Sequence, residues 1–158
     1  MTKKGFTLIE LLIVVAIIGI IAAIAIPNLL VALQKGKQKA TMGDMKTLGT
    51  ALESYVTDWS FVPQVATVVD LRGAGNGLVP FHVKFFPTTD AWGFAFIYEH
   101  GIIGMSDADF YSLTSYGRGG QLGVAVLGTF YECTAIGDFD NDIVYYNGSF
   151  TYGPRTKK

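Results

Sequence analysis

The segment FTLIELLIVVAIIGIIAAIAI, residues 6–26, decides the fold of this chain, and Glu10 is the only charged residue within it. An α-helix of this length is roughly 30 Å long, which matches the thickness of the hydrocarbon core of a bilayer. A charged side chain at the bilayer centre costs at least about 2.5 kcal/mol, so it indicates a functional role by default. Glu10 is therefore a candidate functional residue whose partner has to be identified.

Two general interpretations of this apolar segment compete. Lys3 and Lys4 supply the positive start of a secretory signal peptide, and the Ala-Ile-Ala of residues 23–25 offers a small-residue cleavage site. The apolar stretch is longer than the core of such a signal, and its length favours a single-span anchor with the lysines on the cytoplasmic side. Neither interpretation explains Glu10, which in a plain anchor would be a tolerated carboxylate that snorkels to the interface.

Composition argues against several classes of function. The formal net charge is -1, whereas a nucleic-acid surface needs clustered lysine and arginine, so no nucleic-acid partner is expected. The single Cys133 cannot form an intrachain disulfide and lies in no nucleophile motif. No spacing pairs His82 and His100 as metal ligands. These features predict that the chain is not an enzyme.

A helical pattern continues past the apolar segment, through residues 29–59. Apolar residues recur there at spacings of three and four and form one stripe, which predicts a helix face that packs on a head. The stripe consists of Met45, Leu48, Leu52, Tyr55, Val56 and Trp59. Pro63 predicts that the helix ends a few residues earlier. The basic stretch Lys35–Lys39 is interpreted as a solvated or filament-lining segment just outside the bilayer.

The remainder of the chain predicts a small antiparallel sheet. Residues 95–98 and 110–113 have the composition of strands, as does the longer run 124–131. The best hairpin signal is Asn147-Gly148, which fits a two-residue type I′ turn between the apolar runs 143–146 and 149–152. The glycine-rich run 72–77 lacks the lysine of a phosphate-binding loop and predicts a flexible loop. The fold class is therefore α+β, a long N-terminal helix with a β-sheet head.

One family resemblance explains Glu10. The stretch KGFTLIELLIVVAIIGIIAAIAIPNLL, residues 4–30, resembles the class III signal of type IV pilins and pseudopilins. The resemblance implies that a prepilin peptidase cleaves between Gly5 and Phe6 and methylates the new amine of Phe6. It also implies that Glu10 pairs with the N-terminus of a neighbouring subunit and so sets the register of a filament. Pro27 is expected to kink or locally melt the helix near residues 23–26.

The same resemblance implies the type IV pilin fold and a division of the chain. Residues 1–5 would be the leader, 6–33 the transmembrane and filament-core helix, 34–60 an amphipathic continuation, and 61–158 the head. The expected partners are further copies of the chain, a prepilin peptidase, an inner-membrane platform protein with its assembly ATPase, and minor pilins or pseudopilins. The subunit is expected in the bacterial inner membrane before assembly and in a periplasmic or cell-surface filament afterwards.

Two stretches of the head favour one subtype. Residues 86–98, FPTTDAWGFAFIY, resemble the Asp-Pro-Trp-Gly segment of the major pseudopilin of type II secretion systems, with Ala91 in place of the proline. Residues 110–113 and 141–143 resemble two further elements of that protein. The resemblance implies a subunit of a filament that drives protein export across the outer membrane. The alternative is a type IV pilin that forms surface fibres for adhesion, twitching motility or DNA uptake.

The head also contains a candidate calcium site, although no cofactor is required. The run GDFDND places Asp138, Asp140 and Asp142 within five residues, and carboxylates are the hard oxygen ligands that calcium takes. The resemblance adds the backbone carbonyl of Leu113. Tyr116 occupies the position of a further carboxylate ligand of that family and cannot replace it. The alternative is a solvated acidic turn before a strand.

Overall fold

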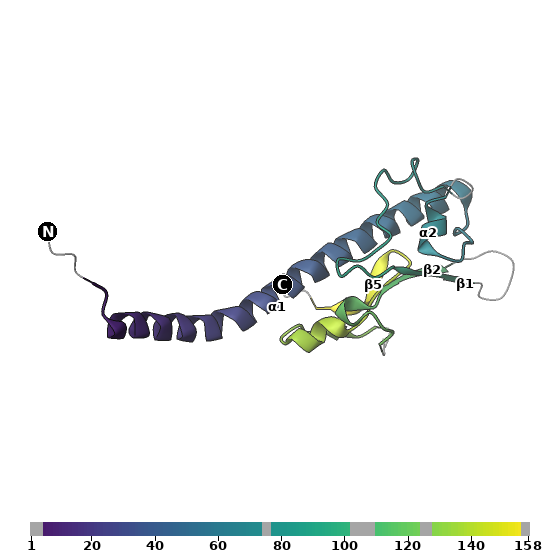
Figure 1. The fold of residues 1–158 in the computed structure, drawn as a ribbon. Helices are drawn as coiled ribbons and strands as arrows, with labels where there is room; N and C mark the ends of the chain where they lie inside the picture. Colours follow the sequence, from purple (N-terminus) through teal and green to yellow (C-terminus); the bar gives the residue numbers. More distant parts are fainter. Residues whose placement is uncertain (1–4, 74–76, 102–109, 124–127, 156–158) are drawn as a thin grey trace.

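The long helix predicted from the sequence is the main element of the structure. The computed structural model describes residues 5–73, 77–101, 110–123 and 128–155. Helix α1 spans Leu8–Trp59, and the head packs against its C-terminal half, while the N-terminal half extends away from the head (Figure 1). The structure is α+β, as predicted.

Both ends of α1 are capped by local interactions. Thr7 is the N-cap, and its side chain accepts a hydrogen bond from the backbone N–H of Glu10. Ser60 is the C-cap in the left-handed conformation, with φ of 65°, and its N–H donates to the carbonyl of Val56 at 2.7 Å. The helix ends a few residues before Pro63, which confirms the prediction.

Pro27 lies inside α1 and does not interrupt it. The helix is continuous across the proline and curves between its two halves (Figure 1). The helix is intact near residues 23–26, so local melting is wrong for this structure, and a kink at Pro27 itself stays a prediction. Proline removes one backbone donor only, and the side-chain amide of Asn28 donates to the carbonyl of Ile24 at 3.1 Å, so the neighbouring turn gains a bond.

The head is built on a five-stranded sheet with the order β1-β2-β4-β5-β3. Strands β1 (Ile97–Gly101), β2 (Phe110–Ser115), β4 (Ile143–Tyr146) and β5 (Ser149–Pro154) pair in antiparallel fashion. The short edge strand β3 (Phe130–Tyr131) pairs parallel to β5. Short helical segments connect them: α2 (Val68–Leu71), η1 (Gly117–Gly119) and η2 (Ile136–Asp140).

The strand predictions agree with the sheet to different degrees. The hairpin β4–β5 is confirmed, and both turn residues have positive φ, 38° at Asn147 and 85° at Gly148, as a type I′ turn requires. Strand β1 begins at Ile97 and not at residue 95, because Ala95 bridges back to Thr89 in the preceding turn. Of the predicted strand 124–131, residues 124–127 lie outside the described residues, as do residues 74–76 of the predicted loop.

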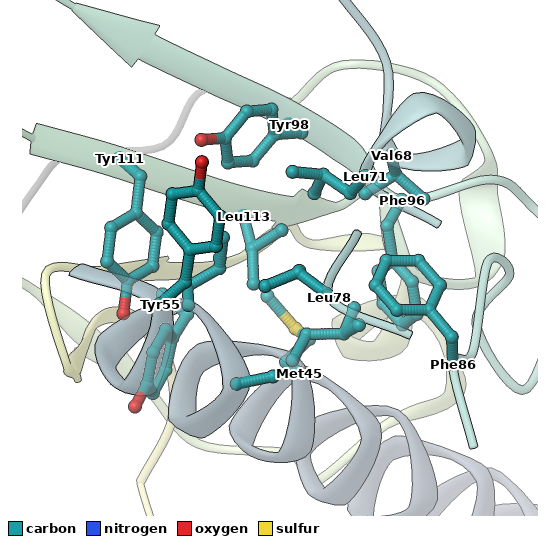
Figure 2. Packing of buried hydrophobic residues seen from close by; sticks show 14 of the residues in the cluster. Met45, Tyr55, Val68, Leu71, Leu78, Phe86, Phe96, Tyr98, Tyr111 and Leu113 are labelled. Carbon is teal, nitrogen blue, oxygen red and sulfur yellow. The ribbon is translucent and has the colours of Figure 1, made fainter. Parts of the chain in front are cut away.

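The core lies between the C-terminal half of α1 and the sheet (Figure 2). Four of the six predicted stripe residues are buried, namely Met45, Leu48, Leu52 and Tyr55. Trp59 was predicted to join them, but it is the last helical residue and remains 59% exposed while stacking on Tyr55. The Tyr145 ring packs directly against Gly49, where a Cβ atom would overlap it.

Candidate assembly site and head anchors

The predicted processing junction precedes the first turn of α1. Gly5 and Phe6 are both exposed, and the helix begins two residues after Phe6, at Leu8. Residues 1–4 of the predicted leader lie outside the described residues. An exposed, non-helical junction can be reached by a protease, which is compatible with cleavage after Gly5.

Glu10 is hydrogen-bonded within its own chain. One carboxylate oxygen, Oε2, accepts from the Thr7 backbone N–H at 2.9 Å and from the Thr7 hydroxyl at 2.5 Å. The Glu10 N–H donates back to the Thr7 hydroxyl oxygen at 3.3 Å, which completes a capping box. Thr7 was not among the partners predicted for Glu10, although the spacing Thr-x-x-Glu before an apolar run is the signature of the capping box.

The first half of α1 packs against no other element among the described residues. Nearly all of its large apolar side chains from Leu8 to Leu33 are exposed, and the first buried residue of the helix is Gln38. Among the described residues, α1 is the one helix that is long and apolar enough to cross a membrane. Exposed apolar surface of this extent indicates contact with lipid or with other protein.

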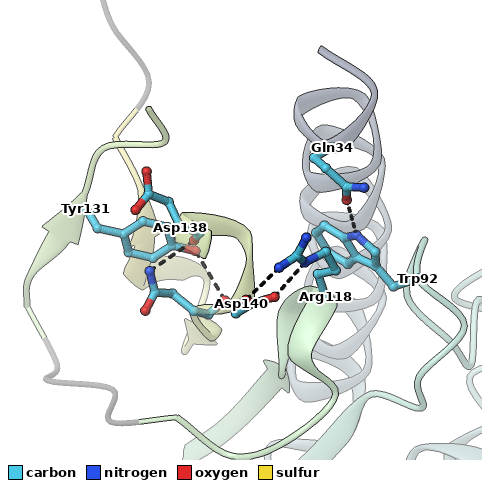
Figure 3. A network of polar contacts seen from close by, with 7 residues as sticks. Gln34, Trp92, Arg118, Tyr131, Asp138 and Asp140 are labelled. Atoms are coloured by element: carbon cyan, nitrogen blue, oxygen red, sulfur yellow. Dashed lines mark hydrogen bonds and ion pairs between the residues drawn. The ribbon is translucent and has the colours of Figure 1, made fainter. Parts of the chain in front are cut away.

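The head is anchored to α1 directly C-terminal to this apolar half. The Trp92 indole N–H donates to the side-chain oxygen of Gln34 at 2.7 Å (Figure 3). About two helical turns farther on, the buried hydroxyl of Thr41 accepts a hydrogen bond from the backbone N–H of Ala91 at 3.1 Å. The stretch that resembles the secretion pseudopilin, residues 86–98, therefore attaches the head to the helix.

A buried carboxylate shapes this anchoring turn. Asp90 accepts from the backbone N–H groups of Trp92 at 3.0 Å and Phe94 at 2.9 Å, and from the hydroxyl of Ser115 at 2.8 Å. These bonds satisfy a charge that would otherwise be costly to bury. This role of Asp90 was not predicted, although an aspartate side chain commonly accepts a hydrogen bond from the backbone N–H two residues later in a turn.

The four predicted calcium ligands are not brought together as one site. Asp138 accepts from the N–H groups of Thr134 and Ala135, both at 2.7 Å, and these bonds lower its pKa. Asp140 forms a bidentate pair with Arg118 at 2.7 and 2.8 Å (Figure 3).

The other two predicted ligands, Asp142 and Leu113, also make contacts elsewhere in the head. Asp142 is 1% exposed and accepts from the Gly123 N–H at 3.0 and 3.1 Å, while burial raises the pKa of its carboxyl. Leu113 is buried in the sheet, paired with Tyr98 and Tyr145. Within the described part of the chain no three acidic, histidine or cysteine side chains cluster as metal ligands. This geometry does not fit a calcium ion, and calcium binding stays an untested prediction.

Ser54, His82 and Asp58 lie close together, but they do not form a catalytic triad. The Ser54 hydroxyl is 3.0 Å from Nδ1 of His82, and the Asp58 carboxylate is 3.8 Å from the same nitrogen. A triad needs the serine on one ring nitrogen and the carboxylate on the other. The cluster instead joins the loop before β1 to the end of α1.

Comparison with known proteins identifies the N-terminal segment. Residues 1–26 match the family described as "Prokaryotic N-terminal methylation motif". The type IV major pilin protein PilA of Myxococcus xanthus is 53% identical over 56 residues, which cover 35% of this chain and 26% of that protein.

Other relatives match most of the chain. Type II secretion system core protein G of Escherichia coli is 28% identical over 133 residues, covering 77% of this chain and 86% of that protein. The protein of the same name from Klebsiella pneumoniae is 28% identical over 134 residues, covering 80% and 84%. No solved structure gives a significant match. The chain therefore carries a prokaryotic N-terminal methylation motif on an exposed apolar helix, and it is similar to a type IV major pilin over its N-terminal third and to type II secretion system core protein G over most of its length.

Proposed function

We propose that this chain is a structural, filament-forming subunit and not an enzyme. The observation that carries the proposal is the exposed apolar half of α1, which the head leaves uncovered. Before assembly, lipid would cover this surface. In a filament, the same surfaces of neighbouring copies would pack together and replace the lipid contacts. A contact repeated from one copy to the next, without closure, builds a helical fibre.

In this proposal a prepilin peptidase cleaves after Gly5, and the new amine of Phe6 is methylated. The positive amine of one subunit then binds the Glu10 carboxylate of its neighbour. The bonds from Thr7 support this order of events, because they satisfy the Glu10 carboxylate in the single subunit until an amine replaces them. Such a pair would fix the axial register of the fibre more than it would stabilise it.

Substitution of Glu10 tests this step. Glu10→Ala should permit cleavage and membrane insertion but abolish efficient fibre assembly, because the neighbour's amine would lose its partner. Thr7→Val is the matched control, since it removes the capping hydroxyl and leaves the carboxylate available. Fibre yield by electron microscopy and processing by immunoblot measure the two steps. Normal fibre yield from Glu10→Ala would overturn the register argument.

The processing junction has a test of its own. Gly5→Asp should leave the lysine-bearing precursor in the membrane, with no fibres, because the peptidase would lose its small residue before the cleaved bond. Mass spectrometry of the N-terminus would detect the uncut leader in the variant and a methylated Phe6 in the wild type. A processed product from Gly5→Asp would contradict cleavage at this position.

Within this class, we favour the major pseudopilin of a type II secretion-like system. The match to core protein G over most of the chain supports it. The proposed partners are an inner-membrane platform protein, an assembly ATPase and minor pseudopilins, with the filament in the periplasm. The second candidate is a surface type IV pilin, which is favoured by the higher identity of the N-terminal 56 residues to a major pilin.

An in-frame deletion strain separates the two candidates. Its secreted proteome and its cell surface under the electron microscope should be compared with those of the parent strain. Loss of specific exported proteins with surface fibres intact would support the pseudopilin. Loss of fibres with normal secretion would favour the pilin, and the similarity of the heads would then reflect fold and not function.

A further inference from the structure

A cationic groove lies at the base of the head, immediately beyond the apolar half of α1. Its volume is about 530 Å³. Lys35 and Lys39 line it from α1, and Arg155 lines it from the residue after β5. The segment after β3 contributes Glu132 and Cys133. Residues that are nearly 120 positions apart in the sequence therefore form one site.

Direct hydrogen bonds hold the walls of this groove together. Gln38 is 5% exposed, and its side-chain amide lies 3.3 Å from the Cys133 thiol and 3.5 Å from the Tyr131 hydroxyl. The backbone N–H of Arg155 donates to the carbonyl of Tyr131 at 2.7 Å. The helix, the β3 segment and the end of β5 are thus fixed to one another, so the groove is preformed.

The charges that line the groove are unbalanced. Lys35, Lys39 and Arg155 carry three positive charges, and Glu132 is the one acidic residue in the lining, so the groove has a formal charge of +2. Among the described residues, none of the three cations forms an ion pair. Lysine and arginine are the side chains that bind phosphate in proteins, which makes an anionic phosphate the ligand that fits.

The position of the groove identifies the source of that phosphate. The apolar half of α1 ends at Leu33, and Lys35 follows within half a turn, so the rim lies at the headgroup level of a membrane-inserted subunit. A second, more apolar cavity of about 250 Å³ shares Met42, Pro154 and Arg155 with the groove and adds Phe130 and Phe150. Met42 is farther from Leu33 along α1 than Lys35 and Lys39, so this apolar cavity lies on the side of the groove that faces away from the bilayer. On the bilayer side the groove borders the exposed apolar half of α1, which suits a lipid phosphate better than a free ion.

We propose that this groove binds the headgroup phosphate of an anionic phospholipid in the leaflet that surrounds the head before assembly. The inference rests on the membrane-inserted stage of the proposed function. Lys35, Lys39 and Arg155 would contact the phosphate, and the glycerol and the acyl chains would extend along the exposed apolar half of α1 into the bilayer. The bound lipid would orient the head on the membrane surface.

The test uses the processed full-length chain in a non-ionic detergent. Dioctanoyl phosphatidylglycerol is titrated while the melting temperature is followed, with dioctanoyl phosphatidylcholine and inorganic phosphate as separate titrations. We expect saturable stabilisation by phosphatidylglycerol and much less by the other two. Lys35→Gln combined with Lys39→Gln should weaken the apparent Kd by at least about tenfold, because each cation near an anionic lipid contributes measurably.

Lys37→Gln is the matched control. Lys37 lies between the two groove lysines in sequence, has the same charge, and does not line the groove. Its loss should change the apparent Kd by less than about twofold, because distant surface charges are screened by salt. Arg155→Gln provides a second groove variant away from α1. Each variant should melt like the wild type in phosphatidylcholine, which shows that it folds.

Three outcomes would overturn the proposal. An equal effect of Lys37→Gln and of the groove variants would indicate diffuse attraction and no site. Equal stabilisation by inorganic phosphate would indicate a site for free anions. No change of the melting temperature with phosphatidylglycerol would show that the groove does not bind this lipid. Failure of the proposed function is read separately, from absent fibres and absent membrane insertion of the wild-type chain in cells.

Discussion

The two halves of helix α1 are continuous in the structure but opposite in their surroundings. Residues 8–33 are apolar except for Glu10 and Asn28 and leave nearly all of their large side chains exposed, whereas residues 34–59 bury one stripe beneath the sheet. A helix that is apolar all round needs lipid or other helices, and an amphipathic helix needs one packed face. The difference shows that the head buries the apolar stripe of the second half only. The apolar surface of the first half has to be covered by a membrane or by other copies in a filament.

The largest expected effect comes from truncating the same residue type in each half. Leu48→Ala should lower the free energy of unfolding of the head by about 2–5 kcal/mol, because Leu48 is fully buried and its loss leaves a cavity. Leu12→Ala, at a 64% exposed position, should change it by less than about 0.5 kcal/mol. Denaturation of both variants in detergent, followed by tryptophan fluorescence, measures the difference. Equal losses would show that the two halves unfold together.

Two helix glycines give a smaller effect with opposite signs. Gly49→Ala should destabilise the head by about 1–3 kcal/mol, because the new Cβ would overlap the Tyr145 ring. Gly43→Ala should stabilise it by about 0.5–1 kcal/mol, since Gly43 has open space around it and alanine favours the helix. Thermal melting compares the two variants. Stabilisation by both would mean that Tyr145 moves aside without cost.

A third prediction concerns the buried Asp142. Burial raises the pKa of this carboxyl above its unfolded value, so its charge costs stability, and the cost grows as the pH rises through the folded-state pKa. Without calcium, Asp142→Asn should therefore gain stability relative to the wild type between about pH 4 and pH 7. It keeps an oxygen to accept the Gly123 N–H.

Melting curves recorded with calcium or with a chelator test whether the head binds calcium, as the sequence predicts, or does not, as the separate partners of the aspartates indicate. The geometry predicts that neither addition changes the wild-type curve. Calcium-dependent stabilisation of the wild type that Asp142→Asn abolishes would restore the predicted metal site. Glu132→Gln, in the same head but outside the acidic turn, controls for the loss of one negative charge.

The smallest expected effect is that of the Arg118–Asp140 pair. The Arg118 side chain lowers the pKa of Asp140 below its unfolded value. The stabilisation is therefore present above the unfolded pKa, about 4, and is lost as the pH falls through the folded-state pKa. Arg118→Gln should flatten the loss of stability below about pH 4.

The effect should be small, because solvent screens a pair whose side chains are 36% and 42% exposed. Melting temperatures between pH 2 and pH 7 measure it, with Lys84→Gln as the control for lost positive charge. An identical pH profile for Arg118→Gln and the wild type would show that the pair contributes nothing to the acid sensitivity of the head.

Local patterns in the sequence predicted the elements that depend on neighbouring residues. The apolar run, the stop before Pro63 and the Asn147-Gly148 hairpin were all predictable, because periodicity and turn chemistry act over a few residues. The parallel pairing of β3 with β5 and the exposure of Trp59 were not. Both depend on where the sheet meets α1, and no short pattern encodes that position.

For the candidate sites, the sequence determined the membrane-spanning length of the apolar segment, the expected cleavage junction after Gly5 and the isolated charge of Glu10. Only the tertiary structure decided that Asp138, Asp140 and Asp142 turn to separate partners, and that Lys35 and Arg155 border one groove. The reason is physical. Spacing along the chain fixes which residues are near in sequence, whereas the direction of each side chain, and every contact across a hundred residues, is set when the sheet packs on the helix.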